Sequence, residues 1–514
     1  MAQLESNKPL NLRIIGLGLI IFIAFTSFID LSPGNPQVTY TAAIAIIMAL
    51  WWVTEAIPIG VTALLPVLLF PAFGIMNGKA VSTVYINYII FLFLGGFMMA
   101  IALEKWNLHK RMALAILMSV GGSPFRILLG FMLASAFLSM WMSNTATAMM
   151  MLPIAFSVLN SLEEEHGKED MNRFSIGILL SIAYACSIGG IATLVGTPPN
   201  LAFVRIFEIT FPNATEISFG QWLIFALPLA IGMFFITLVY LAFLFIPKKP
   251  IKKLNRSFFK EKYKALGPLT YEQKVLSALF ILLILLWIFR KNINIGATVI
   301  PGWSQLLNYP KFINDGTIAI FIALLLFIIP SKENKGEGLI TWNVSYKIPW
   351  HIILLFGGGF ALAKGFLDSG LSAHIGAQLQ SAGNFSDLGL IATITTVMSF
   401  LTEFTSNTAT TEMMLPIISA MATQIGTHPI LLMVPLTLAA SMAFMFPIAT
   451  PPNAIVFGSG KIKMKDMIFT GFFLNMLAII LITLTTYYWL PIAFDMDLSI
   501  FPEWAKEAVL NHSK

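Results

Sequence analysis

Two short polar motifs, each present twice within apolar sequence, constrain this chain more than any other feature. The first runs Ser143-Asn-Thr-Ala-Thr-Ala-Met-Met-Met-Leu-Pro-Ile154 and returns as Ser406-Asn-Thr-Ala-Thr-Thr-Glu-Met-Met-Leu-Pro-Ile417, with ten of twelve positions identical. The second, Thr197-Pro-Pro-Asn200, returns as Thr450-Pro-Pro-Asn453. Because both motifs recur in the same order, the chain consists of two homologous halves.

A glycine pair supports the duplication. Gly95-Gly96 and Gly358-Gly359 are 263 residues apart (358 − 95), the same offset as the first motif pair (406 − 143). The Pro-Pro motifs are 253 residues apart (450 − 197), and the difference matches a polar insert at 161–170 that the second half lacks. We therefore divide the chain into a first repeat at 1–246, a basic linker at 247–274 and a second repeat at 275–514.

The composition places both halves in a membrane. Of the 514 residues 57% are hydrophobic and 11% are charged, whereas soluble domains carry about 25% charged residues. Many apolar runs are near twenty residues long, the length that crosses ~30 Å of hydrocarbon. The first run, 10–29, has no small-residue cleavage site after it, so we expect a transmembrane helix there rather than a signal peptide. The single cysteine, Cys186, excludes an intrachain disulfide.

The first motif predicts re-entrant hairpins. Its flanking apolar arms, 127–142 and 146–159, are each too short to span a bilayer comfortably. Irregular backbone at membrane depth is tolerated only where protein or a wet cavity surrounds it. We therefore expect two hairpins with polar tips at 143–145 and 406–408.

The second motif predicts broken helices. Two consecutive prolines remove two amide donors and clash with the preceding turn, so we expect breaks at 197–200 and 450–453. Paired interruptions in corresponding places of two halves indicate a transporter's binding site. The fold class we expect is an all-α polytopic membrane protein of about eleven transmembrane helices plus the two hairpins.

The linker sets the expected orientation. Short loops rich in lysine and arginine stay on the cytoplasmic side. Counting spans from a cytoplasmic linker gives a multi-pass protein of the plasma (inner) membrane with a cytoplasmic N-terminus, an external C-terminus and inverted repeats. The net charge of +6 therefore indicates membrane orientation and no nucleic-acid partner. The basic residues that cluster at 248–264 of the linker are Lys248, Lys249, Lys252, Lys253, Arg256, Lys260, Lys262 and Lys264.

Each polar tip offers the chemistry of a cation and an anion site. Hydroxyls, one amide and unpaired backbone carbonyls suit sodium, and the following helix directs amide donors and a positive dipole end toward an anion. Neither tip and neither Pro-Pro motif contains Lys or Arg, so bound cations would have to supply the positive charge. The plainer interpretation makes the tips ordinary helix caps and the prolines ordinary kinks. Four motifs paired across two halves argue against it.

The doubled Ser-Asn-Thr and Thr-Pro-Pro-Asn motifs, with the early segment Trp51–Pro66, resemble the divalent anion:sodium symporter family, the INDY-type di- and tricarboxylate transporters. The resemblance implies a homodimer whose protomers combine a scaffold with an elevator-like transport domain. It implies a first sodium site at Ser139, Ser143, Asn144 and Gly196, and a second at Thr402, Thr405, Asn407 and Ala449. Substrate carboxylates would meet Ser143, Asn144, Thr145, Thr197, Ser406, Asn407, Thr408 and Thr450.

The function expected from these features is secondary active transport, not enzyme catalysis. The favoured interpretation is sodium-coupled symport of C4-dicarboxylates (succinate, malate, fumarate) or of citrate. The alternatives are a sodium-independent dicarboxylate exchanger or a sodium/sulfate symporter on the same fold. A channel needs no oppositely facing hairpins, and an intramembrane enzyme needs a catalytic constellation that this sequence does not show.

Two acidic residues distinguish the second tip from the first. Glu403 and Glu412 stand where the first half has Met140 and Met149. Because Glu403 adjoins a residue of the second sodium site, it either tunes cation affinity or makes a buried structural hydrogen bond. The sequence leaves both roles open.

Overall fold

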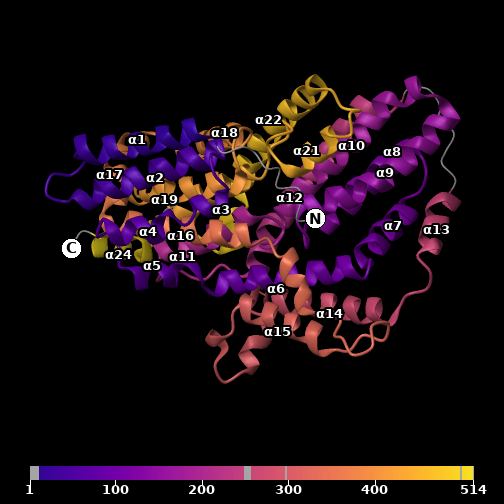
Figure 1. The fold of residues 1–514 in the computed structure, drawn as a ribbon, viewed down its shortest axis with the longest axis horizontal. Helices are drawn as coiled ribbons and strands as arrows, with labels where there is room; N and C mark the ends of the chain where they lie inside the picture. Colours follow the sequence, from indigo (N-terminus) through magenta and orange to yellow (C-terminus); the bar gives the residue numbers. More distant parts are fainter. Residues whose placement is uncertain (1–10, 248–255, 296–297, 498–499, 513–514) are drawn as a thin grey trace.

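The first half of the chain folds into twelve helices within the residues that a computed structural model describes, namely 11–247, 256–295, 298–497 and 500–512. Figure 1 shows the helices crossing the molecule in several layers. They are α1 (Leu12–Phe28), α2 (Pro36–Thr54), α3 (Ile59–Thr62), α4 (Leu65–Ala72), α5 (Gly78–Tyr85), α6 (Tyr88–Lys105), α7 (Leu108–Val120), α8 (Pro124–Ser139), α9 (Asn144–His166), α10 (Lys168–Gly190), α11 (Pro198–Thr210) and α12 (Phe219–Phe245).

The second half repeats the order helix, tip, helix, helix, break, helix and long helix, so that α18 to α22 correspond to α8 to α12. A linker helix, α13 (Arg256–Ala265), precedes it, whereas linker residues 248–255 lie outside the described residues. The α-helices are α14 (Tyr271–Ile288), α15 (Asp315–Ile328), α16 (Trp350–Ser369), α17 (Leu371–Gln378), α18 (Asp387–Leu401), α19 (Asn407–Ile425), α20 (Pro429–Ala440), α21 (Pro451–Phe457), α22 (Met464–Tyr488), α23 (Leu490–Phe494) and α24 (Glu503–His512). The short 3₁₀ turns are η1 (Trp303–Leu306), η2 (Pro310–Phe312), η3 (Trp342–Lys347) and η4 (Gln380–Asn384).

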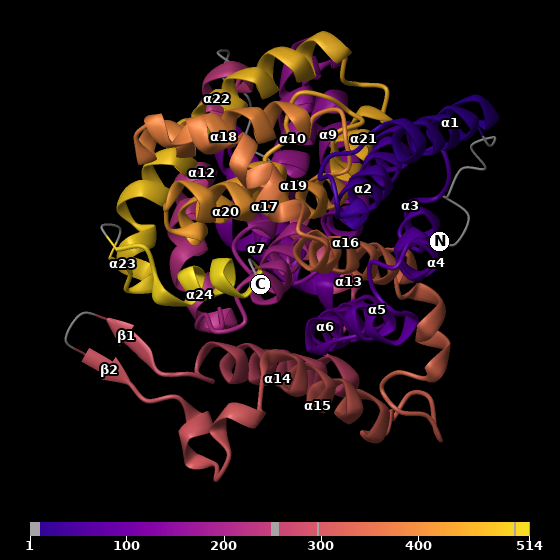
Figure 2. The same cartoon turned by 90° about the vertical axis from the view of Figure 1, so that its left-hand side faces the viewer.

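A two-stranded antiparallel ribbon follows α14. Strands β1 (Ile293–Ile295) and β2 (Thr298–Ile300) pair Ile293 with Ile300. Figure 2 shows this ribbon at one lower edge of the molecule, beside the layer formed by α14 and α15. Within the described residues it is the only sheet, and nothing in the apolar pattern indicated it.

Eight helices of the described residues are long and apolar enough to cross a membrane by length and composition. The arms that enter the two tips, α8 and α18, are shorter, with 16 and 15 residues. At 1.5 Å per residue each is about 24 Å long, less than the ~30 Å of a hydrocarbon core. The short entering arms are therefore as the sequence predicts.

The arm that leaves the first tip is longer than predicted. Helix α9 continues through most of the polar insert to His166, and α10 starts after one residue, Gly167, at φ 88°. The glycine permits this left-handed turn, so the insert lengthens two helices rather than forming a loop.

Both helix breaks begin earlier than the Pro-Pro motifs predict. Helix α10 ends at Gly190 and α20 at Ala440, after which irregular backbone runs to Thr197 and Thr450. The prolines then occupy the first two positions of α11 and α21, where a missing N–H costs nothing because those amides have no intrahelical partner. The expectation that they end the preceding helices was therefore wrong.

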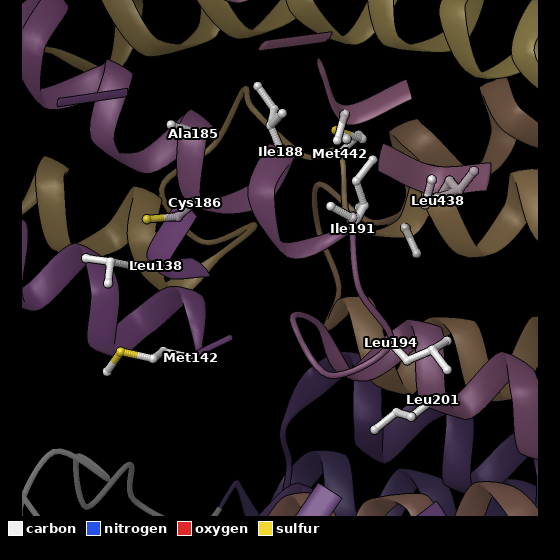
Figure 3. Close-up of a cluster of buried hydrophobic side chains, with 14 of the residues drawn as sticks. Leu138, Met142, Ala185, Cys186, Ile188, Ile191, Leu194, Leu201, Leu438 and Met442 are labelled. Atoms are coloured by element: carbon white, nitrogen blue, oxygen red, sulfur yellow. The ribbon is translucent and has the colours of Figure 1, made fainter. Parts of the chain in front are cut away.

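The two halves are packed through each other. Helix α21 packs against α9 and α10 of the first half, and α11 packs against α19 and α20 of the second. Apolar residues from α8, α10, α11 and α20 fill the layer between them (Figure 3). All residues from Phe174 to Gly190 on α10 are buried, so other parts of the protein surround this helix along that length.

The close helix contacts expected at the repeated glycines are present. A Cβ on Gly95 would lie 2.6 Å from the backbone of Ala319 on α15, and a Cβ on Gly358 would lie 2.6 Å from the carbonyl oxygen of Ala63. Side chains at either position would push the helices apart, as at other small-residue contacts between membrane helices.

An ion-pair cluster joins the segment after α14, the α11–α12 connection and the start of α15. The buried guanidinium of Arg290 contacts Asp315 and Glu216, each at 2.6 Å, and Lys291 reaches Glu216 at 2.7 Å. Burial raises the pKa of Glu216, but the two cations outweigh it and hold that pKa below its ordinary value. This cluster fixes the α11–α12 connection against the start of α15.

Candidate functional site

The first tip starts α9 with two polar side chains that do different things. Ser143 is the N-cap and its hydroxyl oxygen accepts from the amide of Ala146 at 3.2 Å. Asn144 does not cap the helix, because its side-chain oxygen accepts a hydrogen bond from the hydroxyl of Ser139 at the end of α8. Ser143 is therefore an ordinary helix cap, as the plainer interpretation of the tip predicts, whereas Asn144 is not.

Carbonyl oxygens surround Asn144 at two facing glycines. A Cβ on Gly190 would lie 2.8 Å from the side-chain oxygen of Asn144 and 3.3 Å from the carbonyl oxygen of Gly196. A Cβ on Gly196 would lie 3.0 Å from the carbonyl oxygen of Ser139 and closer still to that of Gly190. The glycines leave no room for a side chain here and so let uncharged oxygens come together, the ligand type that a hard cation such as sodium prefers.

Side chains hold the first break in its irregular conformation. The amide of Asn200 donates to the carbonyl oxygens of Thr193 and Ile191, at 2.8 and 3.3 Å. The hydroxyl of Thr193 donates to the carbonyl oxygen of Met140 at 2.5 Å and accepts from the amide of Gly196 at 3.0 Å. Buried backbone groups freed from helical pairing need such partners.

The second tip repeats the central contact of the first. The hydroxyl of Thr402 is 2.7 Å from the side-chain oxygen of Asn407 and 2.8 Å from the carbonyl oxygen of Ala440. Thr405 is engaged elsewhere, since its hydroxyl donates to the carbonyl oxygen of Leu401 at 2.9 Å and accepts from Thr410 at 2.6 Å. Ser406 is the N-cap of α19, and its side chain makes no capping hydrogen bond.

A buried carboxylate supports the second break. Glu403 is fully buried and accepts from the amides of Phe444, Met445 and Phe446 at 2.8 to 3.1 Å. The side-chain amide of Asn475 donates to it at 2.7 Å. Of the two roles that the sequence left open for Glu403, these contacts support the structural hydrogen bond.

The broken segments of the two halves meet. The hydroxyl oxygens of Thr197 and Ser441 are 3.4 Å apart, and the rings of Tyr184 and Phe444 pack edge to face with centroids 5.1 Å apart. This direct contact joins the two broken segments across 244 residues of sequence.

The tips differ in exposure. Ser143 at the first tip is exposed, whereas Thr405 and Thr408 at the second are buried. The second tip faces α2, where Thr405 and Ser406 share a narrow crevice with Trp52. Access to the tips is therefore unequal in this conformation.

The structure brings together most of the residues expected at the two sodium sites. Around the first tip it gathers Ser139, Asn144 and Gly196, with Gly190 as an addition. Around the second it gathers Thr402 and Asn407, while Thr405 points to α18 and α19 rather than to Asn407. Of the expected substrate residues, Ser143, Asn144 and Thr145 start α9, Asn407 and Thr408 start α19 after the cap Ser406, and Thr197 and Thr450 cap α11 and α21.

The chemistry available at this centre is binding rather than bond-breaking. Four helices start at the tips and breaks, and each presents the positive end of its dipole there. The side chains that converge carry hydroxyl and amide oxygens, and the described residues contain no cluster of three His, Cys, Asp or Glu side chains. Such a centre can hold sodium ions beside an anion.

Sequence reasoning missed several supporting residues. Thr193 and Asn475 were not singled out, and the partners of Glu403 are 41 to 72 residues away along the chain. For Thr193 one signal was available, since a hydroxyl four residues before a Thr-Pro-Pro motif can cap irregular backbone. For Asn475, deep inside an apolar helix, the signal was its polarity alone.

Comparison with known proteins agrees with this geometry. The family model described as the sodium:sulfate symporter transmembrane region matches residues 13–494. The chain belongs to this family. It is 41% identical over 505 residues to the sodium-dependent dicarboxylate transporter SdcS of Staphylococcus saprophyticus, with 96% of this chain and 95% of that protein covered. The SdcS protein of Staphylococcus aureus is 42% identical over 508 residues with the same coverage.

Two solved structures share the fold at low sequence identity. Neisseria gonorrhoeae MtrF, described within a class of antimetabolite efflux pumps, superposes with a TM-score of 0.55 at 12% identity, covering 94% of this chain and 99% of MtrF. The Alcanivorax borkumensis YdaH transporter gives 0.51 at 13% identity, covering 82% of this chain and 88% of YdaH. The matching family and the SdcS relatives are transporters, not enzymes.

Proposed function

We propose that this protein is a secondary active transporter that carries C4-dicarboxylates (succinate, malate or fumarate) or citrate together with sodium ions. The observation that carries the proposal is the convergence of uncharged oxygens at Gly190 and Gly196, next to helix N-termini and with no Lys or Arg in either tip or Pro-Pro motif. The printed names of the SdcS relatives, sodium-dependent dicarboxylate transporters, point to the same substrate class.

In this mechanism the co-transported sodium ions neutralise the charge of the divalent substrate anion. The first-turn amides of α9 and α19 and the hydroxyls of Thr145 and Thr408 would bind the carboxylate oxygens. Sodium ions at Asn144 and Asn407 would lie beside the anion, so each charge lowers the cost of desolvating the other. Thermodynamic linkage then requires sodium to tighten anion binding by the same factor as the anion tightens sodium binding.

The test is a titration of purified protein with succinate in sodium and in choline buffer, followed by thermal stability or calorimetry. We expect succinate to bind at least about tenfold more tightly in sodium, a coupling of about 1.4 kcal/mol. Equal affinities would contradict symport and favour a sodium-independent exchanger. Tighter binding of sulfate than of any dicarboxylate would favour a sodium/sulfate symporter, the activity that the family description names.

We further propose that the two repeats are inverted in the membrane and work as an elevator, because the four motifs form one centre that must keep its geometry while access alternates. The moving unit would contain α8 to α11 and α18 to α21. It would also contain α12, which packs against α8, α10 and α22. The wall would include α1 to α5.

Cysteine pairs in a Cys186→Ser background test this division. Glu163 and Lys461 form an ion pair between the two halves, so a crosslink there should leave transport intact. Val53 and Met413 line one crevice between α2 and α19, so a crosslink there should stop transport while substrate still binds. The opposite pattern would reject the elevator.

The remaining proposals concern assembly and orientation. By resemblance to its family the protein would form a homodimer, and the basic linker would keep the N-terminus cytoplasmic and the C-terminus external. Mass measurement in detergent tests the dimer. Labelling of a cysteine at Lys463, expected inside, against one at Glu503, expected outside, tests the orientation.

A further inference from the structure

Glu412 is a buried acid that the proposed transport mechanism does not use. It lies on α19, one turn beyond Thr408, and its exposure is 0%. Both of its carboxylate oxygens lack a hydrogen-bond partner among the described residues. At the corresponding place of the first half, α9 has Met149, an uncharged residue that is only partly buried. An acid without partners inside a membrane protein marks a functional position.

The carboxyl group lies against a helix that has no side chain there. A Cβ on Gly359 of α16 would come within 2.5 Å of the carboxyl carbon of Glu412. The two preceding glycines of α16 make similar room, since a Cβ on Gly357 would meet the ring of Tyr85 and one on Gly358 would meet the backbone of Ala63. Three consecutive glycines thus let α16 pack against α5, α3 and α19 at once, close to the middle of the views in Figures 1 and 2.

Among the described residues, no basic side chain pairs with the carboxylate. Tyr85, whose hydroxyl donates to the carbonyl oxygen of Ala63 at 2.5 Å, is the ionisable side chain that interacts electrostatically with Glu412. Two basic side chains on helices that pack against α19 are already paired, Lys364 of α16 with Asp368 at 2.7 Å and Arg205 of α11 with Glu208 at 3.2 Å. The other ionisable side chains on helices packed against α19 are His351, His374, Tyr40, Glu503, Lys506 and Glu507.

The energetic consequence is clear. An isolated ionised carboxylate in an apolar interior costs several kcal/mol even after relaxation, so such a group takes up a proton instead. Sodium would need several further oxygens around the carboxylate, whereas a proton needs none beyond the carboxyl itself. The glycine and aromatic surroundings therefore favour a proton over a metal ion as the bound cation.

We propose that Glu412 is a proton-binding site at the interface of α19 and α16, and that the transporter passes through this conformation only with Glu412 protonated. In the elevator proposed above, α19 travels with the hairpins. The carboxyl group leaves Gly359 when this interface opens, and its proton then exchanges with water. Uptake therefore requires a proton on Glu412 in addition to sodium, and this inference rests on the proposed transport function.

The sign of the pH effect follows directly. Protonation stabilises the closed interface, so uptake is complete at low pH and is lost as the pH rises through the ionisation of Glu412 in the open state. For one proton the loss approaches about tenfold for each pH unit beyond the midpoint. The substrate must not titrate in the same range, so fumarate is suitable, since its carboxyls stay ionised between about pH 6.5 and about pH 9.

The experiment measures sodium-driven fumarate uptake into proteoliposomes across that pH range. Wild type should lose uptake as the pH rises, whereas Glu412→Gln, a neutral isostere, should keep the low-pH rate within about twofold and lose the pH dependence. Glu412→Met, which copies the first half, should behave like the glutamine variant and serves if that variant folds poorly. Met149→Gln is the matched control and should keep the wild-type profile.

A second readout is independent of transport. Infrared spectra of folded wild type should contain the C=O stretch of a protonated carboxylic acid that is absent from Glu412→Gln. A pH profile identical in wild type and both Glu412 variants, a folded Glu412→Gln without uptake at any pH, or no infrared difference would each overturn the proposal. Wild type without sodium-driven uptake at any pH would instead overturn the proposed function, and the infrared comparison would still decide the proton.

Discussion

In the two hairpin regions, α9 and α19 begin with the same five residues, Ser-Asn-Thr-Ala-Thr. The broken segments beside them are held by different side chains. In the first, the broken segment is held by hydroxyl and amide groups of Thr193 and Asn200. In the second, the carboxylate of Glu403 takes three consecutive backbone amides, with Asn453 and Asn475 as helpers. The asparagine of each Pro-Pro motif supports both breaks in the same way, whereas Thr193 in the first half and Glu403 in the second have no equivalent in the other half.

The length of each break explains this difference. The first runs only from Ile191 to Thr197 and is bounded by Gly190 and Gly196, which let it fold closely on itself. The second runs from Ser441 to Thr450, and alanines stand where the first has these glycines. A longer irregular segment leaves more buried amides without partners, and an acceptor with two oxygens satisfies several at once.

The largest expected effect tests whether both halves are needed for transport. Asn144→Ala and Asn407→Ala should each reduce sodium-driven uptake of radiolabelled succinate at least about 100-fold, or about 2.7 kcal/mol. Each substitution removes the side-chain oxygen that accepts a hydrogen bond from the hydroxyl at the end of the preceding arm, Ser139 or Thr402. Folding is checked by size-exclusion chromatography. Normal uptake by either well-folded variant would show that the asparagine of that tip is not needed for transport.

The carboxylate of the second half should matter for stability more than its counterpart in the first. Glu403→Gln keeps one acceptor but loses the charge and part of the contact with the amides of Phe444 to Phe446, so we expect a loss of about 2 kcal/mol in detergent unfolding. Met140→Gln, the matched change in the first half, should cost less than about 1 kcal/mol. Equal losses would remove the contrast between the two breaks.

The glycine pair of the first half, Gly190 and Gly196, offers a sharper probe of sodium. Gly190→Ala places a Cβ 2.8 Å from the side-chain oxygen of Asn144, so the apparent sodium affinity should fall about tenfold. Gly96→Ala, whose Cβ would lie 3.6 Å from Val195 in ordinary contact, should have little effect. The second half already has alanine at the corresponding position 443. Unchanged sodium dependence in Gly190→Ala would place the ion elsewhere.

The smallest expected effect concerns the hydroxyl that supports the first break. Thr193→Val should cost about 1 kcal/mol of stability, since it leaves the carbonyl of Met140 and the amide of Gly196 without their partner. Thr193→Ser should restore most of it. If serine fails to rescue, the methyl group rather than the hydroxyl is what the break requires.

The helix starts around the site could be predicted because they depend on local sequence motifs that occur in both halves. The helix starts at the tips follow from Ser143 and Ser406 as caps, and the starts of α11 and α21 follow from Thr197 and Thr450 before prolines. The ends of α10 and α20 could not be placed, since an apolar run gives no sign of where helical pairing stops.

The supporting contacts were beyond a single sequence for another reason. Glu403 meets the amides of residues 444 to 446 and the side chain of Asn475 only after two helices have packed. Position along the chain says nothing of such contacts. The resemblance gave candidate lining residues, whereas the residues that hold them are visible only in the packed structure.

The proline pairs at the starts of α11 and α21 make the four helix ends unequal as hosts for an anion. Proline has no N–H, so these two ends contribute a dipole but lack the two outermost donors. At α9 the cap Ser143 occupies one amide, while at α19 the cap Ser406 occupies none. A carboxylate would therefore accept hydrogen bonds at the starts of α9 and α19, whereas the starts of α11 and α21 would attract it only through their dipoles. Such a ligand can leave the starts of α11 and α21 while the starts of α9 and α19 still bind it. Release then proceeds in steps.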